Sequence, residues 1–221
     1  MNTIRSTPIG ESRFAGTNRR LGSAARLLLW LGLVALSGCS LMPEVQPDPT
    51  RFYVLTATAT PAAASASVES PARVLLRPIV VPEFLRGRVM QVRMSENEVK
   101  YIDEARWAEP LEAALNRVLR ENLLQQPGLH VVARASDSHD FEVLLQVRRC
   151  EGISAAGVAR LSARIEIYSG DIESKLVAAD DFTTDVPGWD GKDFAQLAGK
   201  LSVAAATLTE RIFTLLPSRK S

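Results

Sequence analysis

Residues 161–167 read Leu161-Ser162-Ala163-Arg164-Ile165-Glu166-Ile167, so that apolar and polar side chains alternate at every position. The same period of two runs through 141–148, and another extended segment, 175–184, follows the turn at Gly170-Asp171. This period is typical of a strand that buries one face and leaves the other in water. Three long strands in succession predict an antiparallel meander with one solvated face.

Two amphipathic helices are predicted to cover the buried face of this sheet. The C-terminal one carries apolar residues at steps of three and four over roughly 23 residues: Phe194, Leu197, Leu201, Ala204, Leu208, Ile212 and Leu215. Asp190 or Asp193 can cap its start. The other helix follows the apolar period that begins at Trp107, with Pro110 in its first turn and Pro127-Gly128 at its end.

Shorter strands are predicted at 73–81, 88–94, 98–102 and 129–134, with 88–94 and 98–102 joined as a hairpin. Together these elements predict an α+β fold. It is a two-layer sandwich, in which a mainly antiparallel sheet is packed on one side by the two amphipathic helices. We expect one α+β domain over residues 72–217, a length that suits a single core.

The N-terminal residues 1–38 have the organisation of a lipoprotein signal peptide. A positive region containing Arg19, Arg20 and Arg26 precedes ten apolar residues, 27–36, which are too few to span a bilayer. Leu36-Ser37-Gly38-Cys39 matches a lipobox, which predicts cleavage between Gly38 and Cys39. Lipidation of Cys39 is expected, because diacylglycerol is attached through a thiol. The alternative is an ordinary signal peptide with a chance cysteine.

Residues 39–71 are predicted to be a lipidated tether with one short strand at 51–55. Its second half, 56–71, is rich in Ala, Ser, Thr and Pro and lacks the apolar bulk needed for ordering, so we expect a flexible segment. Acyl chains such as palmitate on Cys39 would provide the anchor.

Charge and cysteine content exclude several classes of function. The whole chain has 26 basic and 25 acidic residues, but the mature part has 21 and 24 because the signal peptide is basic. No basic run marks a nucleic-acid site, so no nucleic-acid partner is expected. With Cys39 lipidated, Cys150 has no disulfide partner and is predicted to be a buried, inert thiol.

Catalytic and metal-binding patterns are weak. Ser136 or Ser138 could act with His139 as a hydrolase, but a polar turn explains the same residues better. Asp180, Asp181, Asp185 and Asp190 match no EF-hand loop. The sequence therefore predicts no enzyme, no cofactor and no metal site.

Four segments resemble the PqiC/YmbA-type family of ABC-type intermembrane-transport auxiliary lipoproteins. They are Phe52–Leu55, Val80–Leu85, Arg106–Leu111 and the C-terminal helix. The third is the most specific, and its Trp107, Pro110 and Leu111 are expected to be structural. Arg86-Gly87-Arg88-Val89 departs from the Asp-Arg-Pro-like sequence that is common in the family.

The resemblance implies a non-enzymatic docking subunit on the periplasmic face of the outer membrane. It implies as partners an MCE-domain periplasmic protein and inner-membrane components that move phospholipid and maintain membrane integrity. Ser40 agrees with outer-membrane sorting, because the residue that commonly retains lipoproteins in the inner membrane is Asp. A homo-oligomer is compatible with this role. The alternative is an accessory lipoprotein of outer-membrane assembly or polysaccharide export.

Overall fold

The computed structural model describes residues 22, 47–58 and 71–217. The rest of the predicted signal peptide, the lipobox with Cys39 and most of the segment 56–71 lie outside these residues. All the helices and strands described below belong to one compact unit, Pro49–Ser221.

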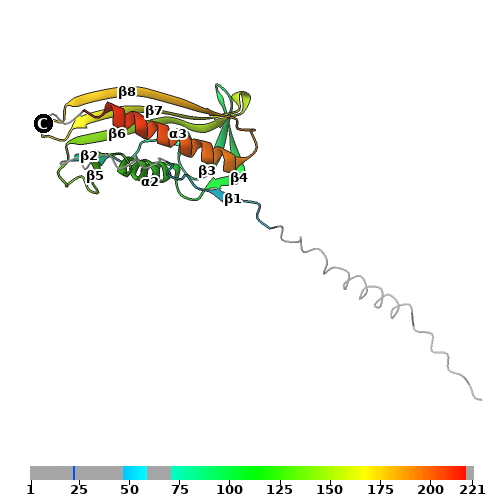
Figure 1. The fold of residues 1–221 in the computed structure, drawn as a ribbon. Helices are drawn as coiled ribbons and strands as arrows, with labels where there is room; N and C mark the ends of the chain where they lie inside the picture. The colour runs from blue at the N-terminus through cyan, green and yellow to red at the C-terminus, as the bar shows by residue number, and fades with distance from the viewer. Residues whose placement is uncertain (1–21, 23–46, 59–70, 218–221) are drawn as a thin grey trace, which may run out of the picture. The chain divides into compact units, whose positions relative to one another are not determined.

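Within the described residues, eight strands form one sheet, and two long helices pack against it (Figure 1). The strands are β1 (Arg51–Tyr53), β2 (Ala72–Leu76), β3 (Val89–Ser95), β4 (Glu98–Trp107), β5 (Leu129–Val131), β6 (Phe141–Ile153), β7 (Val158–Ser169) and β8 (Leu176–Pro187). The helices are α2 (Leu111–Leu124) and α3 (Phe194–Leu215), with short 3-10 turns η2 (Glu83–Leu85) and η3 (Ser154–Ala156). The predicted α+β class is confirmed.

The predicted meander is formed by β6, β7 and β8, which pair antiparallel along nearly their whole length. The alternation in β7 has the expected effect, because Leu161, Ala163, Ile165 and Ile167 are all buried in the core. Arg164 and Glu166 lie on the other face and are partly exposed. The sheet thus has one face under the helices and one open face.

The sequence did not predict the parallel pairings. The first residues of β6 pair with β2, and its last residues pair with β3, both in parallel. β2 with β5 and β1 with β4 are also parallel. Each of these contacts spans only two or three residue pairs, so the sheet remains mainly antiparallel.

The second predicted helix begins later than its apolar period. Trp107 is the last residue of β4, and α2 starts at Leu111 with Pro110 as its N-cap residue rather than in its first turn. The backbone of Pro110 is extended, with ψ at 138°. Trp107 and Leu111 are both buried, so one apolar stripe is supplied by a strand and then by a helix.

Helix α3 is capped by Asp193, whose Oδ1 accepts hydrogen bonds from the amides of Ala195 and Gln196 at 2.9 and 3.0 Å. Asp190 instead holds the preceding turn, accepting from the amides of Lys192 and Asp193. The side chain of Ser202 in this helix accepts a hydrogen bond from the Thr56 amide, which attaches the chain after β1 to α3.

Candidate functional site

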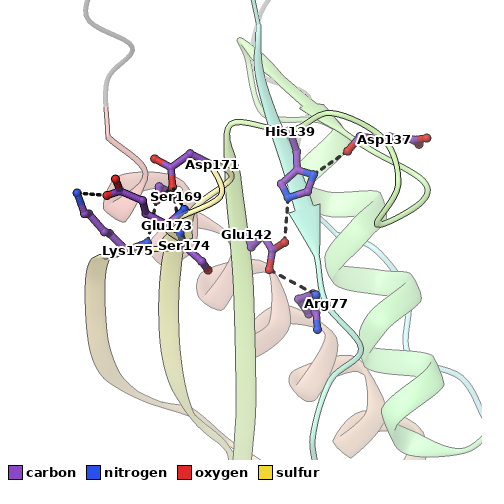
Figure 2. Close-up of polar contacts among 9 residues, drawn as sticks. All are labelled: Arg77, Asp137, His139, Glu142, Ser169, Asp171, Glu173, Ser174 and Lys175. Atoms are coloured by element: carbon purple, nitrogen blue, oxygen red, sulfur yellow. Dashed lines mark hydrogen bonds and ion pairs between the residues drawn. The ribbon is translucent and has the colours of Figure 1, made fainter.

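The residues of the less favoured hydrolase alternative, Ser136, Ser138 and His139, are not arranged as a catalytic group. Figure 2 shows the His139 ring between the Asp137 carbonyl, 2.7 Å from Nδ1, and Glu142 Oε1, 2.9 Å from Nε2. Ser138 Oγ accepts a hydrogen bond from Arg73 at 2.7 Å. Both ring nitrogens of His139 therefore contact oxygen atoms other than the serine hydroxyls, and the cluster joins a turn to the start of β6.

The aspartates of β8 contact arginines. Asp180 pairs with Arg211, and the guanidinium lowers the pKa of that carboxyl. Asp185 pairs with Arg160 at 2.6 Å, and this hydrogen bond likewise lowers the pKa of Asp185. Within 47–58 and 71–217, no three metal-binding side chains gather into a site.

Two of the three family-motif residues, Trp107 and Leu111, lie in the core, and Pro110 is half-buried. Trp107 and Leu111 are almost fully buried, and Pro110 ends the extended chain just before α2. Glu109, from the same motif, accepts hydrogen bonds from Arg117 in α2, with the closest approach 2.6 Å. These contacts join the end of β4 to α2, and they place none of the three residues on a binding surface.

An exposed apolar surface lies at Val80–Leu85, the segment between β2 and β3. Val81 and Leu85 are buried and hold the segment to the domain, whereas the side chains of Val80 and Phe84 are 57% and 36% exposed. Tyr101 of β4 is 50% exposed and donates a hydrogen bond from its hydroxyl to the Phe84 carbonyl at 3.2 Å. We call Val80, Phe84 and Tyr101 the η2 surface.

A charged pair supports the η2 surface from below. The Arg93 guanidinium lies 5.9 Å from the centre of the Phe84 ring. It also binds Glu151 in a bidentate manner, with Nε to Oε1 at 2.5 Å and Nη2 to Oε2 at 3.2 Å. The Glu151 side chain is completely buried. Such a pair is directional, so it holds Arg93 in one geometry beside the Phe84 ring.

Gln91 is a buried amide in the part of the sheet that carries Tyr101 of the η2 surface. It lies in β3 opposite Tyr101 and is 5% exposed, and neither amide atom has a hydrogen-bond partner within the described residues. A buried amide without partners costs about 1–3 kcal/mol. This buried amide thus lies directly beside Tyr101 of the η2 surface.

Phe52 extends the exposed apolar groups along the same face. It lies opposite Arg106 of β4 and is 61% exposed. Its neighbour Tyr53 is directed to the other face, where its ring lies 6.4 Å from that of Phe194 in α3. Sequence reasoning identified both Phe52 and Phe84 only through the family resemblance, because exposure of an apolar residue leaves no signal in a local pattern.

A shallow depression adjoins the η2 surface. Its volume is about 300 Å³, and Val80, Pro82, Phe84, Gln146 and Arg148 contribute to its lining.

In the part of the chain that the structure describes, no helix has the length and hydropathy needed to cross a bilayer.

Solved structures share this fold. A DUF330 protein from Xanthomonas campestris matches with a TM-score of 0.63 and 22% identity, covering 75% of this chain and 95% of its own. An uncharacterized protein matches with a TM-score of 0.60 and 19% identity, covering 74% and 96%. No curated protein matches the chain significantly.

The model of the ABC-type transport auxiliary lipoprotein component family matches residues 53–213, which include β2 to β8, α2, all but the last two residues of α3, and the η2 surface. The match covers more than half of the chain and confirms the predicted resemblance. This chain therefore belongs to the family of ABC-type transport auxiliary lipoprotein components.

Proposed function

We propose that this protein is a non-enzymatic docking subunit of an MCE-type intermembrane phospholipid transport system, held on the periplasmic face of the outer membrane by acyl chains on Cys39. The observation that carries the proposal is the family match over residues 53–213. The lipobox at Leu36–Cys39 supports it by supplying a membrane anchor upstream of that match. The engaged ring nitrogens of His139 agree with a role without catalysis.

The η2 surface is the part of the domain best suited to hold the periplasmic partner. Exposed aromatic side chains such as that of Tyr101, together with a nearby arginine, Arg93, are of the types that contribute most to protein–protein affinity. The bidentate Arg93–Glu151 pair keeps the surface rigid, so little conformational entropy is lost on binding. The η2 surface would thus act as a preformed docking patch.

The proposed anchor would restrict where docking occurs. From Cys39 to Arg51, the first residue of β1, the chain has twelve residue steps and spans at most about 40 Å. A lipidated Cys39 would therefore keep the domain close to the membrane surface. Tethering raises the effective concentration of the domain there, so moderate affinity for a transport partner suffices.

Co-purification with the MCE-domain protein tests the docking role. The lipidated protein, expressed with the MCE-domain protein of the same bacterium, should recover it from detergent extracts. Phe84→Ala combined with Tyr101→Ala should reduce recovery at least tenfold, because central aromatic groups contribute about 2 kcal/mol or more each. Val203→Ala is the matched control, since Val203 is also exposed but lies on α3. No recovery with the unmodified protein would refute the docking role.

Fractionation tests the anchor separately. The unmodified protein should be found in the outer-membrane fraction, whereas Cys39→Ala should remove it from membranes. Recovery of the unmodified protein in the inner membrane would contradict the assignment to the outer membrane, and membrane retention of Cys39→Ala would contradict anchoring through Cys39.

A further inference from the structure

A groove runs between α2 and the segment that follows β2. It consists of two adjoining depressions of about 530 and 480 Å³, which share Pro78, Asn116 and Arg120 in their linings. Ile79 and Ala113 add apolar wall to the first, and Arg77 lines the second. We call this cavity the α2 groove; it lies apart from the residues of the η2 surface.

Three polar residues of α2 line the groove in a row. Glu112, Asn116 and Arg120 are spaced by four residues, which places their side chains one above the other on the same helix face. The row spans about 12 Å along the helix axis, at 1.5 Å per residue. An acid therefore lies at one end of the groove, an amide at its middle and a cation at the other end.

The positive charge of Arg120 is not compensated by a carboxylate. Its guanidinium donates hydrogen bonds to the carbonyls of Val132 and Val131 at 2.9 and 3.3 Å, and it forms no ion pair within the described residues. Neighbouring Arg117, by contrast, pairs with Glu109 and Glu121. A guanidinium has five N–H donors, so Arg120 retains donors for an anion.

Glu112 carries the complementary charge. It forms no ion pair within the described residues, and its Oε2 atom is buried without a hydrogen-bond partner there. A carboxylate in the first turn of a helix is stabilised by the helix dipole, which explains an acid at this position. The dipole does not explain a buried carboxylate oxygen without a donor, which is costly unless a cationic or N–H group reaches it.

We propose that the α2 groove binds the headgroup of a zwitterionic phospholipid of the phosphoethanolamine type. The ammonium group contacts Glu112, the phosphate contacts Arg120, and Asn116 lies between them. The first carbons of the acyl chains lie against Pro78 and Ile79. Arg77 and Arg117 also line the groove, but they pair with Glu142 and with Glu109 and Glu121. Glu112 and Arg120 are therefore the charges left for a ligand, and an anionic headgroup would leave Glu112 without a partner. The inference deepens the proposed function by naming a lipid class, and it rests on that function only for the choice of a lipid.

Binding of three defined probes tests this assignment. The mature lipidated protein in nonionic detergent is titrated with dihexanoyl-phosphatidylethanolamine, dihexanoyl-phosphatidylglycerol and glycerophosphoethanolamine, with binding measured by native mass spectrometry. We expect the phosphatidylethanolamine to bind at least tenfold more tightly than either other probe. Equal binding of the two lipids would overturn the zwitterion assignment. If glycerophosphoethanolamine, which has no acyl chains, bound as tightly as the phosphatidylethanolamine, the proposed contact of the acyl carbons with Pro78 and Ile79 would be wrong.

Variants locate the site. Glu112→Gln should abolish the preference for phosphatidylethanolamine over phosphatidylglycerol, and Arg120→Gln should weaken both lipids. Because Arg120 also bonds to backbone carbonyls, thermal melting is measured for each variant, and Glu112→Gln decides the outcome if Arg120→Gln unfolds. Glu210→Gln, an exposed acid on α3, is the control and should bind like the unmodified protein. A preference that survives Glu112→Gln would refute the site.

The same variants separate this inference from the docking role. Glu112→Gln should still recover the MCE-domain protein, because Glu112 lies outside the η2 surface. If Glu112→Gln loses the lipid preference but still recovers the MCE-domain protein, the lipid and the partner bind at two separate sites. An absent lipid preference in the unmodified protein refutes the groove assignment alone, whereas absent recovery of the partner refutes the docking role alone.

Discussion

Gly152 in β6 should not tolerate even one added methyl group. A Cβ atom at this position would lie 2.3 Å from Cζ3 and 2.5 Å from Cη2 of Trp189. The ring cannot easily move away. It is buried, its Nε1 donates a hydrogen bond to the Asp193 carbonyl at 2.9 Å, and it meets Phe194 edge to face at 6.2 Å. The packing of Trp189 thus links the end of β6 to the start of α3.

The cost of Gly152→Ala follows from this overlap. Ordinary carbon contacts are about 3.5–4.0 Å, so the new methyl would overlap the ring by more than 1 Å. Overpacking of this kind costs about 1–3 kcal/mol. Removing glycine restricts the unfolded chain and returns about 0.4–1 kcal/mol. We therefore expect a net loss of about 1–2 kcal/mol in the free energy of unfolding, which lowers the melting temperature by about 2–8 °C.

Urea unfolding monitored by circular dichroism measures this loss. Gly199→Ala is the control, because its Cβ would meet nothing within 4 Å in the middle of α3. It should stabilise the protein by about 0.5–1 kcal/mol through helix propensity alone. In a Trp189→Leu background, Gly152→Ala should cost less, since the ring that it strikes is absent. A Gly152→Ala protein as stable as the unmodified one would show that the proposed overlap is relieved at no cost.

Four further predictions concern other parts of the domain. Glu151→Gln should lower the free energy of unfolding by about 3 kcal/mol, because it breaks an ion pair whose carboxylate is completely buried and whose arginine, Arg93, is mostly buried; a loss below 1 kcal/mol in urea titration would contradict this. Asp193→Ala should cost about 1 kcal/mol by removing the cap of α3, again by urea titration. Burial raises the pKa of the Cys150 thiol to about 12, so a maleimide at pH 8 should label it only in denaturant; rapid labelling of the folded protein would be inconsistent with this burial. The hydrogen bond from Arg160 lowers the pKa of Asp185, so its stabilising contribution is present above the unfolded pKa of about 3.9 and is lost as pH falls through the lower folded value. Asp185→Asn should therefore flatten the fall in stability below pH 4, measured by thermal melting, and leave the pH dependence between 5 and 7 unchanged.

Local periodicity was sufficient to predict the elements with the most regular patterns. The alternation of β7 and the apolar stripe of α3 each describe one buried face, and both elements are where they were expected. The pattern in β6 ended too early, because a register shift between Val147 and Arg149 interrupts the alternation while the strand continues to Ile153. A bulge changes which side chains are buried without ending the strand.

Contacts between distant residues decided the features that local side-chain patterns could not predict. Trp107 fits a helical period, yet it pairs with Tyr53 in the sheet, a contact between residues far apart in the chain. The same applies to the candidate sites. The α2 groove needs Pro78 and α2 side by side, and the η2 surface needs Tyr101 beneath the Phe84 carbonyl.

The sequence by itself determined the α+β class and the buried cysteine, because side-chain period and composition are local properties of the chain. Its lipobox at Cys39 stays a prediction. Only the tertiary structure decided that Val80 and Phe84 face solvent while Val81 and Leu85 are buried, and that Glu112 and Arg120 line one groove. Exposure depends on which distant segments cover a residue, and no local period records that.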